Sequence, residues 1–449
     1  MSKLEGNGGP QQTTPGTQPA PMWWCRLGKA EGFLSRDNPL ATTDQHVVED
    51  RAMALLLRPE LQRTHATVMT LFEEVLAVPT REHADLFPDM IDEYMFHHVM
   101  RAANGDPNQP LVARFMAPPH HWFGRDVPGS RWAGDCPDFI YRIVPIAHSG
   151  RYEVRGAQTG ATRPICFYSL MSESTSAPQT LTLLEGLDMN YEPDGNFTLT
   201  VDESPAEGRR NHIQTKPGCE FLMIRDALGD WMTESPNALT VSRLDPRQAP
   251  KTEDQMVQHA MKIAIEGVYF TYYCMRVGNR TWPNEVRPPM LSSVFGGVAT
   301  QWGTVGRLVL KDDEALVVRS NSAGAGFRNL QLYSLFQTTL DYWTRSSSIN
   351  MAQMTPDEDG DFTYVIAHRD PGVANWLDMM GRTQLNVGQR WQGFTRNGAR
   401  SDPWTTTQVT KFDDLDKELP AGVARIDAGA RKAQLAARET GFRRRFIDS

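Results

Sequence analysis

The sequence predicts a mainly β protein with helical additions, an α+β fold built on two jelly-roll-like β-sandwiches. Three observations predict it. Short alternating segments separated by Gly, Pro, Asp and Asn run from about 110 to 245 and again from about 292 to 411. The phrase DGNFT at 194–198 returns as DGDFT at 359–363. Between the two β-rich stretches, residues 252–277 have the apolar spacing of one helix.

The chain of 449 residues divides into six expected parts. The composition of the first part, rich in Gly, Pro, Gln and Thr, is typical of disorder. The second part is expected to be helical because apolar residues recur every three or four positions from 44 to 103. The parts are a disordered lead-in, a helical segment, a first β-sandwich, a helical linker, a second β-sandwich and a basic helical tail, over residues 1–21, 22–109, 110–250, 251–291, 292–411 and 412–449. The arginines of the tail are expected to face solvent, since charge runs usually do.

The repeated phrase belongs to a longer match at one offset, 165 residues (359 − 194 = 165). Asp-Gly favours a tight hairpin, because glycine adopts positive φ without a Cβ clash. The constant offset predicts that one β-sandwich unit occurs twice. The aligned pairs are Tyr168-Ser169-Leu170 with Tyr333-Ser334-Leu335, Asp194-Gly195 with Asp359-Gly360, Phe197-Thr198 with Phe362-Thr363, and Arg225 with Arg390.

Composition narrows the class of protein. A net charge of −8 and a pI near 5.8 argue against a nucleic-acid-binding protein. Five dispersed cysteines without a CxxC motif fit a reducing compartment and suit neither a disulfide framework nor a zinc ribbon. No apolar run approaches the ~20 residues that span a bilayer. We therefore expect a cytoplasmic protein without metal or cofactor that takes a small-molecule partner, with homo-oligomerisation left open.

Residues of the β-rich part resemble a known pair of families. The carriers are GDCPDFIYRIVPI at 134–146, the strand that begins with Gly-Arg-Tyr at 150–152, and HRDPGVANWLD at 368–378 followed by a strand ending at Arg390. Together they resemble the paired bacterial domains of unknown function numbered twelve-fifty-four and twelve-fourteen, over residues 110–395. The resemblance implies tandem β-sandwich or jelly-roll domains without an agreed general activity. This chain departs from the pattern at Cys136, where the resemblance implies asparagine.

Two loops concentrate side chains that can carry chemistry, and each also has a purely structural interpretation. In the loop at 368–378, His368 is a candidate base and Arg369 a carboxylate clamp, but Asp370-Pro371-Gly372 is also an ordinary turn. In the loop at 120–138, paired aspartates are candidates for an acid and a base, but Asp also suits a folded loop. Arg225 and Arg390 are expected either to enter equivalent clefts or to form structural ion pairs, and their repetition favours the structural role.

The functional hypothesis is a cofactor-independent enzyme with lyase or hydrolase type acid–base chemistry on a small organic molecule in catabolism. The alternatives are a non-catalytic carbohydrate- or small-ligand-binding protein and a structural or assembly module. The enzyme hypothesis requires the two loops to meet in space. Its candidate catalytic residues are His368, Asp138, Asp135 and Asp378, and its candidate binding residues are Arg369, Asn375, Trp376, Arg390, Arg225, Trp122 and Tyr141.

Overall fold

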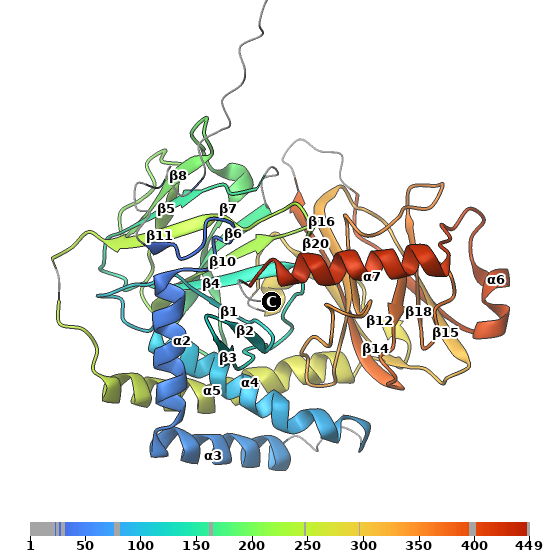
Figure 1. The fold of residues 1–449 in the computed structure, drawn as a ribbon, viewed down its shortest axis with the longest axis horizontal. Coiled ribbons are helices and arrows are strands. Elements are labelled where there is room, and N and C mark those ends of the chain that lie inside the picture. Colours follow the sequence, from blue (N-terminus) through green and yellow to red (C-terminus); the bar gives the residue numbers. More distant parts are fainter. Residues whose placement is uncertain are drawn as a thin grey trace, which may run out of the picture.

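The computed structural model contains two pairs of β-sheets side by side, with helices along one edge and a C-terminal helix across the front (Figure 1). The α+β fold class is confirmed. The structure describes Trp23, Leu27 and residues 32–75, 81–160, 165–246, 248–295, 297–394 and 401–446. The expected lead-in at 1–21 lies outside the described residues.

The first β-sandwich pairs a five-stranded sheet with a four-stranded sheet. Alternate residues of both sheets, such as Val154, Leu199 and Leu222, form one buried core between them. The five-stranded sheet has the order β1 (Ala113–Phe115), β4 (Phe139–Pro145), β10 (Cys219–Ala227), β6 (Ile165–Ser172) and β7 (Thr180–Glu185). The four-stranded sheet has the order β11 (Ala238–Arg243), β5 (Tyr152–Ala157), β8 (Asn196–Asp202) and β9 (His212–Gln214).

The second β-sandwich has the same construction, with a core that includes Leu316, Leu330 and Val387. Its larger sheet has the order β12 (Glu285–Val286), β14 (Trp302–Val309), β20 (Gln384–Phe394), β16 (Ala325–Tyr333) and β17 (Ser348–Asn350), with β13 (Met290–Leu291) also paired to β14. Its smaller sheet has the order β19 (Trp376–Asp378), β18 (Phe362–Ala367), β15 (Glu314–Ser320) and β21 (Thr405–Lys411). The sandwich therefore begins at β12, inside the range expected for the linker.

Strand order confirms the internal duplication. Each strand of the first sandwich has a counterpart at the same place in the second, and the one parallel pair of each, β8 with β9 and β18 with β19, also corresponds. Arg225 lies opposite Phe167 and Arg390 lies opposite Asn329. The offset between β6 and β16 is thus 162 residues (329 − 167 = 162), not 165. The alignment of Tyr168 with Tyr333 is therefore wrong, because Leu330 occupies the position that corresponds to Tyr168.

The helical segment consists of α2 (Thr43–Leu56), α3 (Pro59–Val75) and α4 (Phe87–Ala103), with a short 3-10 helix, η2 (Arg81–Leu86), before α4. A β-hairpin, β2 (His120–Trp122) and β3 (Arg125–Val127), follows. The expected linker helix is α5 (Glu253–Asn279), which starts with a capping box between Thr252 and Gln255. Helix α5 packs against α3 and α4 and also against β14 and β20, so it joins the helical layer to the second sandwich.

The C-terminal segment holds both sandwiches together. After β21 come η5 (Phe412–Asp414), α6 (Leu415–Glu418) and the long α7 (Ala428–Arg443), which crosses the front of the molecule (Figure 1). Arg431, Arg438 and Arg445 recur every seven residues and are all buried. Arg438 donates to carbonyl and side-chain oxygens of the second sandwich, whereas Arg445 donates to the Pro137 carbonyl of the first. The expectation of a solvated tail is wrong at these three arginines, because they bond to backbone and side-chain oxygens that the helix covers.

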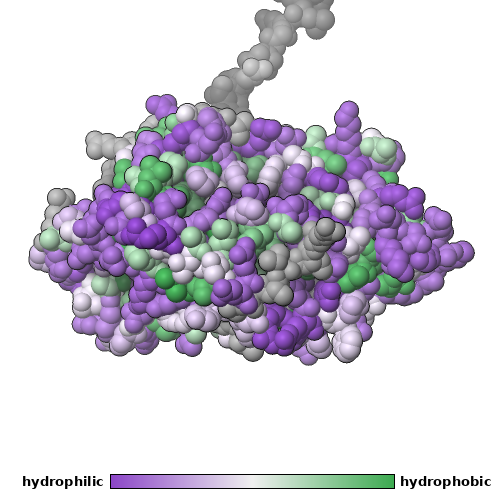
Figure 2. Space-filling model, turned by 90° about the horizontal axis from the view of Figure 1, so that it is seen from below, coloured by the Kyte–Doolittle hydropathy of each residue, from purple (hydrophilic) through white to green (hydrophobic). Residues whose placement is uncertain are grey.

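The face seen from below is mostly hydrophilic, with hydrophobic side chains in small separate patches (Figure 2). Among the helices that the structure describes, none is long and apolar enough to cross a membrane.

Candidate functional site

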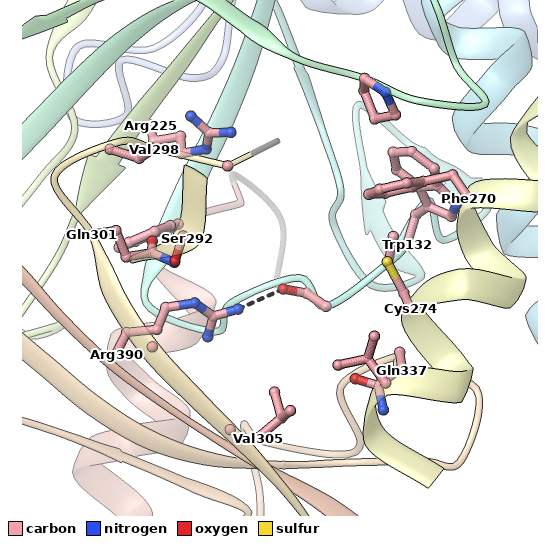
Figure 3. Close-up of a pocket in the computed structure, with 18 of the residues that line it drawn as sticks. Trp132, Arg225, Phe270, Cys274, Ser292, Val298, Gln301, Val305, Gln337 and Arg390 are labelled. Atoms are coloured by element: carbon pink, nitrogen blue, oxygen red, sulfur yellow. Dashed lines mark hydrogen bonds between the residues drawn. The ribbon is translucent and has the colours of Figure 1, made fainter. Parts of the chain in front are cut away.

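A cavity of about 280 Å³ lies where the two sandwiches and α5 meet. This volume is close to the lower end of small-molecule pockets, about 300–1,000 Å³. In Figure 3, Arg225, Arg390, Ser292 and Gln301 form one side, and Trp132, Phe270, Cys274 and Gln337 lie across from them. The wider lining includes Arg101, Phe139, Tyr141, Met171, Phe221, Met223, Tyr273, Val277, Arg287, Met290, Val298, Val305, Tyr333 and Gly388.

Strand alternation directs side chains into this cavity. In β10, Leu222 and Ile224 enter the core of the first sandwich, so Met223 and Arg225 point to the opposite face and line the cavity. In β20, Leu385 and Val387 enter the second core, so Gly388 and Arg390 line the cavity. The outer faces of the two larger sheets thus supply opposite parts of one wall.

Arg225 is a half-buried cation with little internal compensation. Its Nη1 donates to Ser169 Oγ at 2.9 Å, and no described carboxylate pairs with it. Burial lowers the pKa of Arg225 to about 10, with Tyr141 opposing and Arg390 adding to the decrease. Tyr141 is the residue opposite Arg225 on the neighbouring strand β4.

Arg390 is held more tightly. Its guanidinium donates to Gln331 Oε1 at 2.8 Å, to the Gly134 carbonyl at 2.7 Å and to the Tyr333 hydroxyl at 2.7 Å. The bond to Gly134 appears as the dashed line in Figure 3. Because Gly134 belongs to the loop before β4 and Arg390 to β20, this arginine also links the two sandwiches.

The charge of the cavity wall is positive. Arg101, Arg225, Arg287 and Arg390 line it, and none of the described lining residues is Asp, Glu or His. Arg101 is neutralised by Glu220, whose Oε2 lies 2.5 Å from its Nη2. Arg287 has one long side-chain hydrogen bond, 3.4 Å from Nε to Thr281 Oγ1. The rest of the lining is mostly apolar or aromatic.

The lining contains no group with a pKa suited to proton transfer near neutrality. Burial raises the pKa of the Cys274 thiol to about 12. Burial also raises the pKa of Tyr141 and Tyr333 well above the usual value for tyrosine. These groups are therefore protonated at neutral pH, and the cavity is suited to binding more than to acid–base exchange.

The loop at 120–138 places its acidic residues outside the cavity lining. Asp138 is fully buried and accepts hydrogen bonds from Asn350 at 2.6 Å and from the Trp231 indole at 3.1 Å. Asp135 accepts from the backbone and the hydroxyl of Thr339. Both carboxylates thus tie the first sandwich to the second. Trp122 is buried in the core beside α2, where its indole donates to Glu49.

The loop at 368–378 lies at another part of the second sandwich. His368 contacts the Leu310 carbonyl, the exposed Arg369 packs on Phe412, and Asp378 pairs with Arg345. Asn375 accepts from the Thr355 N–H and donates to the Thr355 and Thr363 carbonyls, while Trp376 donates to Ala367. Both loops are fully described, and no hydrogen bond or ion pair joins one to the other. The meeting of the two loops, on which the expected catalytic set depends, does not occur.

Of the residues expected at a site, the cavity brings together Arg225, Arg390 and Tyr141. Sequence reasoning missed the contribution of α5, whose Phe270, Cys274 and Val277 line the cavity at helical spacing. An apolar stripe on a helix is ordinarily core, so the signal was visible but ambiguous. Tyr333 was noted only as part of the repeat.

No family model matches the chain, and no curated protein matches it significantly. Among solved structures, an uncharacterised protein from Burkholderia cenocepacia is similar over 81% of this chain and 100% of that chain, with 21% identity and a TM-score of 0.66. A protein from Vibrio parahaemolyticus is similar over 74% of this chain and 98% of that chain, with 10% identity and a TM-score of 0.42. The Burkholderia likeness shows a shared fold and nothing about activity.

Proposed function

We propose that the protein binds a small, largely hydrophobic organic molecule in the cavity between its two β-sandwiches. The observation that carries this proposal is the enclosed space itself, about 280 Å³ lined by aromatic and aliphatic side chains with a few polar groups. Such a composition is typical of small-molecule sites, where apolar contact supplies affinity and polar groups fix orientation. The sides facing each other across the cavity come from different structural units, so a ligand would contact both sandwiches and α5.

Binding is supported better than acid–base catalysis. None of the expected catalytic residues His368, Asp135, Asp138 and Asp378 lines the cavity, and the described lining residues offer no carboxylate or imidazole. Lyase or hydrolase action on the bound molecule stays a prediction, which mass spectrometry of ligand recovered after incubation would test. Membership of the domain family numbered twelve-fourteen, and the jelly-roll description of each sandwich, are likewise proposals supported by the residues quoted for them.

The test is a thermal-shift screen with paired probes, 2-naphthoate with 2-naphthalenemethanol and decanoate with 1-decanol. A ligand that binds only the native state raises the melting temperature by mass action. We expect at least one pair to shift the wild-type protein and to leave a Cys274→Trp variant, whose indole fills the cavity, unshifted. The proposal is wrong if no probe shifts the wild-type protein up to its solubility limit, or if the filled variant responds equally.

A further inference from the structure

The arginines of the cavity differ in how far the protein itself compensates their charge. Arg101 has a carboxylate partner in Glu220, and Arg390 donates to three oxygens. Arg225 has a single partner, the neutral hydroxyl of Ser169. Within the described chain it is the cavity arginine with a short hydrogen bond to one neutral group and no carboxylate.

An incompletely compensated cation in an apolar site has a cost. Removing a charge from water is unfavourable unless an opposite charge and hydrogen bonds replace the lost solvation. Ser169 occupies Nη1, whereas the remaining guanidinium surface is part of the cavity wall. The positive field of Arg390 adds to the cost, because it acts on Arg225 and depresses its pKa. An anion placed here would relieve both effects.

We propose that Arg225 anchors the carboxylate of an organic monocarboxylate, with the hydrophobic body of that molecule lying toward Trp132 and Phe270. This inference rests on the proposed function and names its ligand class. The planar guanidinium fork matches a carboxylate in two parallel N–H···O bonds. A single negative charge suits the site, because a dianion would lose more solvation in a mostly apolar cavity. Arg390 keeps its three oxygen partners and adds a favourable field.

The experiment is isothermal titration calorimetry at neutral pH with 2-naphthoate and its neutral counterpart, 2-naphthalenemethanol. The two probes share an aromatic body and differ in the charge of the head group. The proteins are the wild type, Arg225→Gln, Arg225→Lys and the control Arg369→Gln. Arg369 is an exposed arginine packed on Phe412, away from the cavity, so its loss removes the same charge elsewhere.

The wild-type protein is expected to bind 2-naphthoate about 10- to 100-fold more tightly than the alcohol, the ratio that charge-assisted hydrogen bonds supply. Arg225→Gln should remove that preference while the affinity for the alcohol changes less than about 3-fold. Arg225→Lys should restore part of it, because the charge returns without the fork. Arg369→Gln should match the wild type.

The outcomes separate this inference from the proposed function. If both probes bind the wild type equally, or if Arg225→Gln keeps the preference for the carboxylate, the anchor is wrong and the cavity remains a binding site. If neither probe binds and the thermal-shift screen is also negative, the proposed function itself fails. An intact circular dichroism spectrum and melting temperature of each variant exclude misfolding as the cause.

Discussion

Arg225 and Arg390 occupy corresponding strands of the two sandwiches, 165 residues apart (390 − 225 = 165), and both line the same cavity. Duplication would ordinarily place equivalent residues in two separate clefts. Here the outer faces of the two larger sheets bound one space, so the pair converges. Their surroundings have diverged, since Arg225 lies opposite Tyr141 on β4 and Arg390 lies opposite Gly303 on β14.

The difference between the two arginines predicts opposite effects on stability. Arg225→Met removes a poorly compensated cation and should raise the free energy of unfolding of the ligand-free protein by about 1–2 kcal/mol. Arg390→Met should lower it by about 2–3 kcal/mol, because Gln331, Gly134 and Tyr333 lose their donor. Urea denaturation of both variants measures the pair. A loss of stability in Arg225→Met as large as in Arg390→Met would contradict the assignment of different roles.

The cavity predicts that one larger side chain is tolerated. Cys274 lines it, and phenylalanine at this position would occupy empty volume without displacing a hydrogen-bonded group. Cys274→Phe should keep or raise the melting temperature and weaken the binding of 2-naphthoate at least about 10-fold. Differential scanning fluorimetry with and without the probe checks both effects. A strong destabilisation would mean that the space is already filled by the protein.

Buried arginines in α7 predict a position-dependent cost of substitution. Arg438→Ala removes donors to Tyr342, Ser348 and Gln353 inside the protein and should reduce the free energy of unfolding by about 3 kcal/mol. The matched control is Arg443→Ala on the exposed side, where the partner is Glu439 and the change should stay within about 0.5 kcal/mol. Equal costs in chemical denaturation would refute the role of α7 as a buried clasp.

Asp135 predicts a pH dependence of stability. Burial raises its pKa to about 6, against the opposing effects of Arg131 and Thr339. A carboxyl whose pKa is higher in the folded state than in the unfolded state binds its proton more tightly when folded. Its contribution to stability is therefore greatest below about pH 4 and is lost as the pH rises to about 6.

The comparison for this prediction is Asp135→Asn, which keeps the shape and cannot titrate. The free energy of unfolding of the wild type, relative to the variant, should fall by about 2–3 kcal/mol between pH 4 and pH 6.5. Urea denaturation at a series of pH values measures the difference, and other carboxyls cancel because both proteins contain them. Parallel curves would show that Asp135 titrates normally.

Much of the fold could be predicted from the sequence because its signals are local. The Asp-Gly turns at 194 and 359, the alternation of strands and the apolar spacing of α5 each depend on neighbouring residues. The Tyr-Ser-Leu match misled, since an offset inferred from one segment need not hold across a loop of different length. β6 and β16 differ from the remainder by three residues (165 − 162 = 3).

The site was harder to predict, because it depends on packing between distant segments. Asp138 and His368 both belong to polar-rich loops, but only the fold decides that one is buried against Asn350 and the other reaches the Leu310 carbonyl. The same limit applies to the tail, where nothing in the composition distinguishes buried Arg438 from exposed Arg443. The repeat did single out Arg225 and Arg390, but repetition alone favoured a structural role.

The central claim is that a carboxylate ligand lies between the two sandwiches at Arg225. The most direct measurement is a crystal structure of the protein with 6-bromo-2-naphthoate, with the bromine located by its anomalous signal. The account predicts one bromine peak inside the cavity near Trp132 and Phe270, with the carboxylate paired to the Arg225 guanidinium. A bromine peak elsewhere, or a carboxylate turned away from Arg225 inside the cavity, would contradict it.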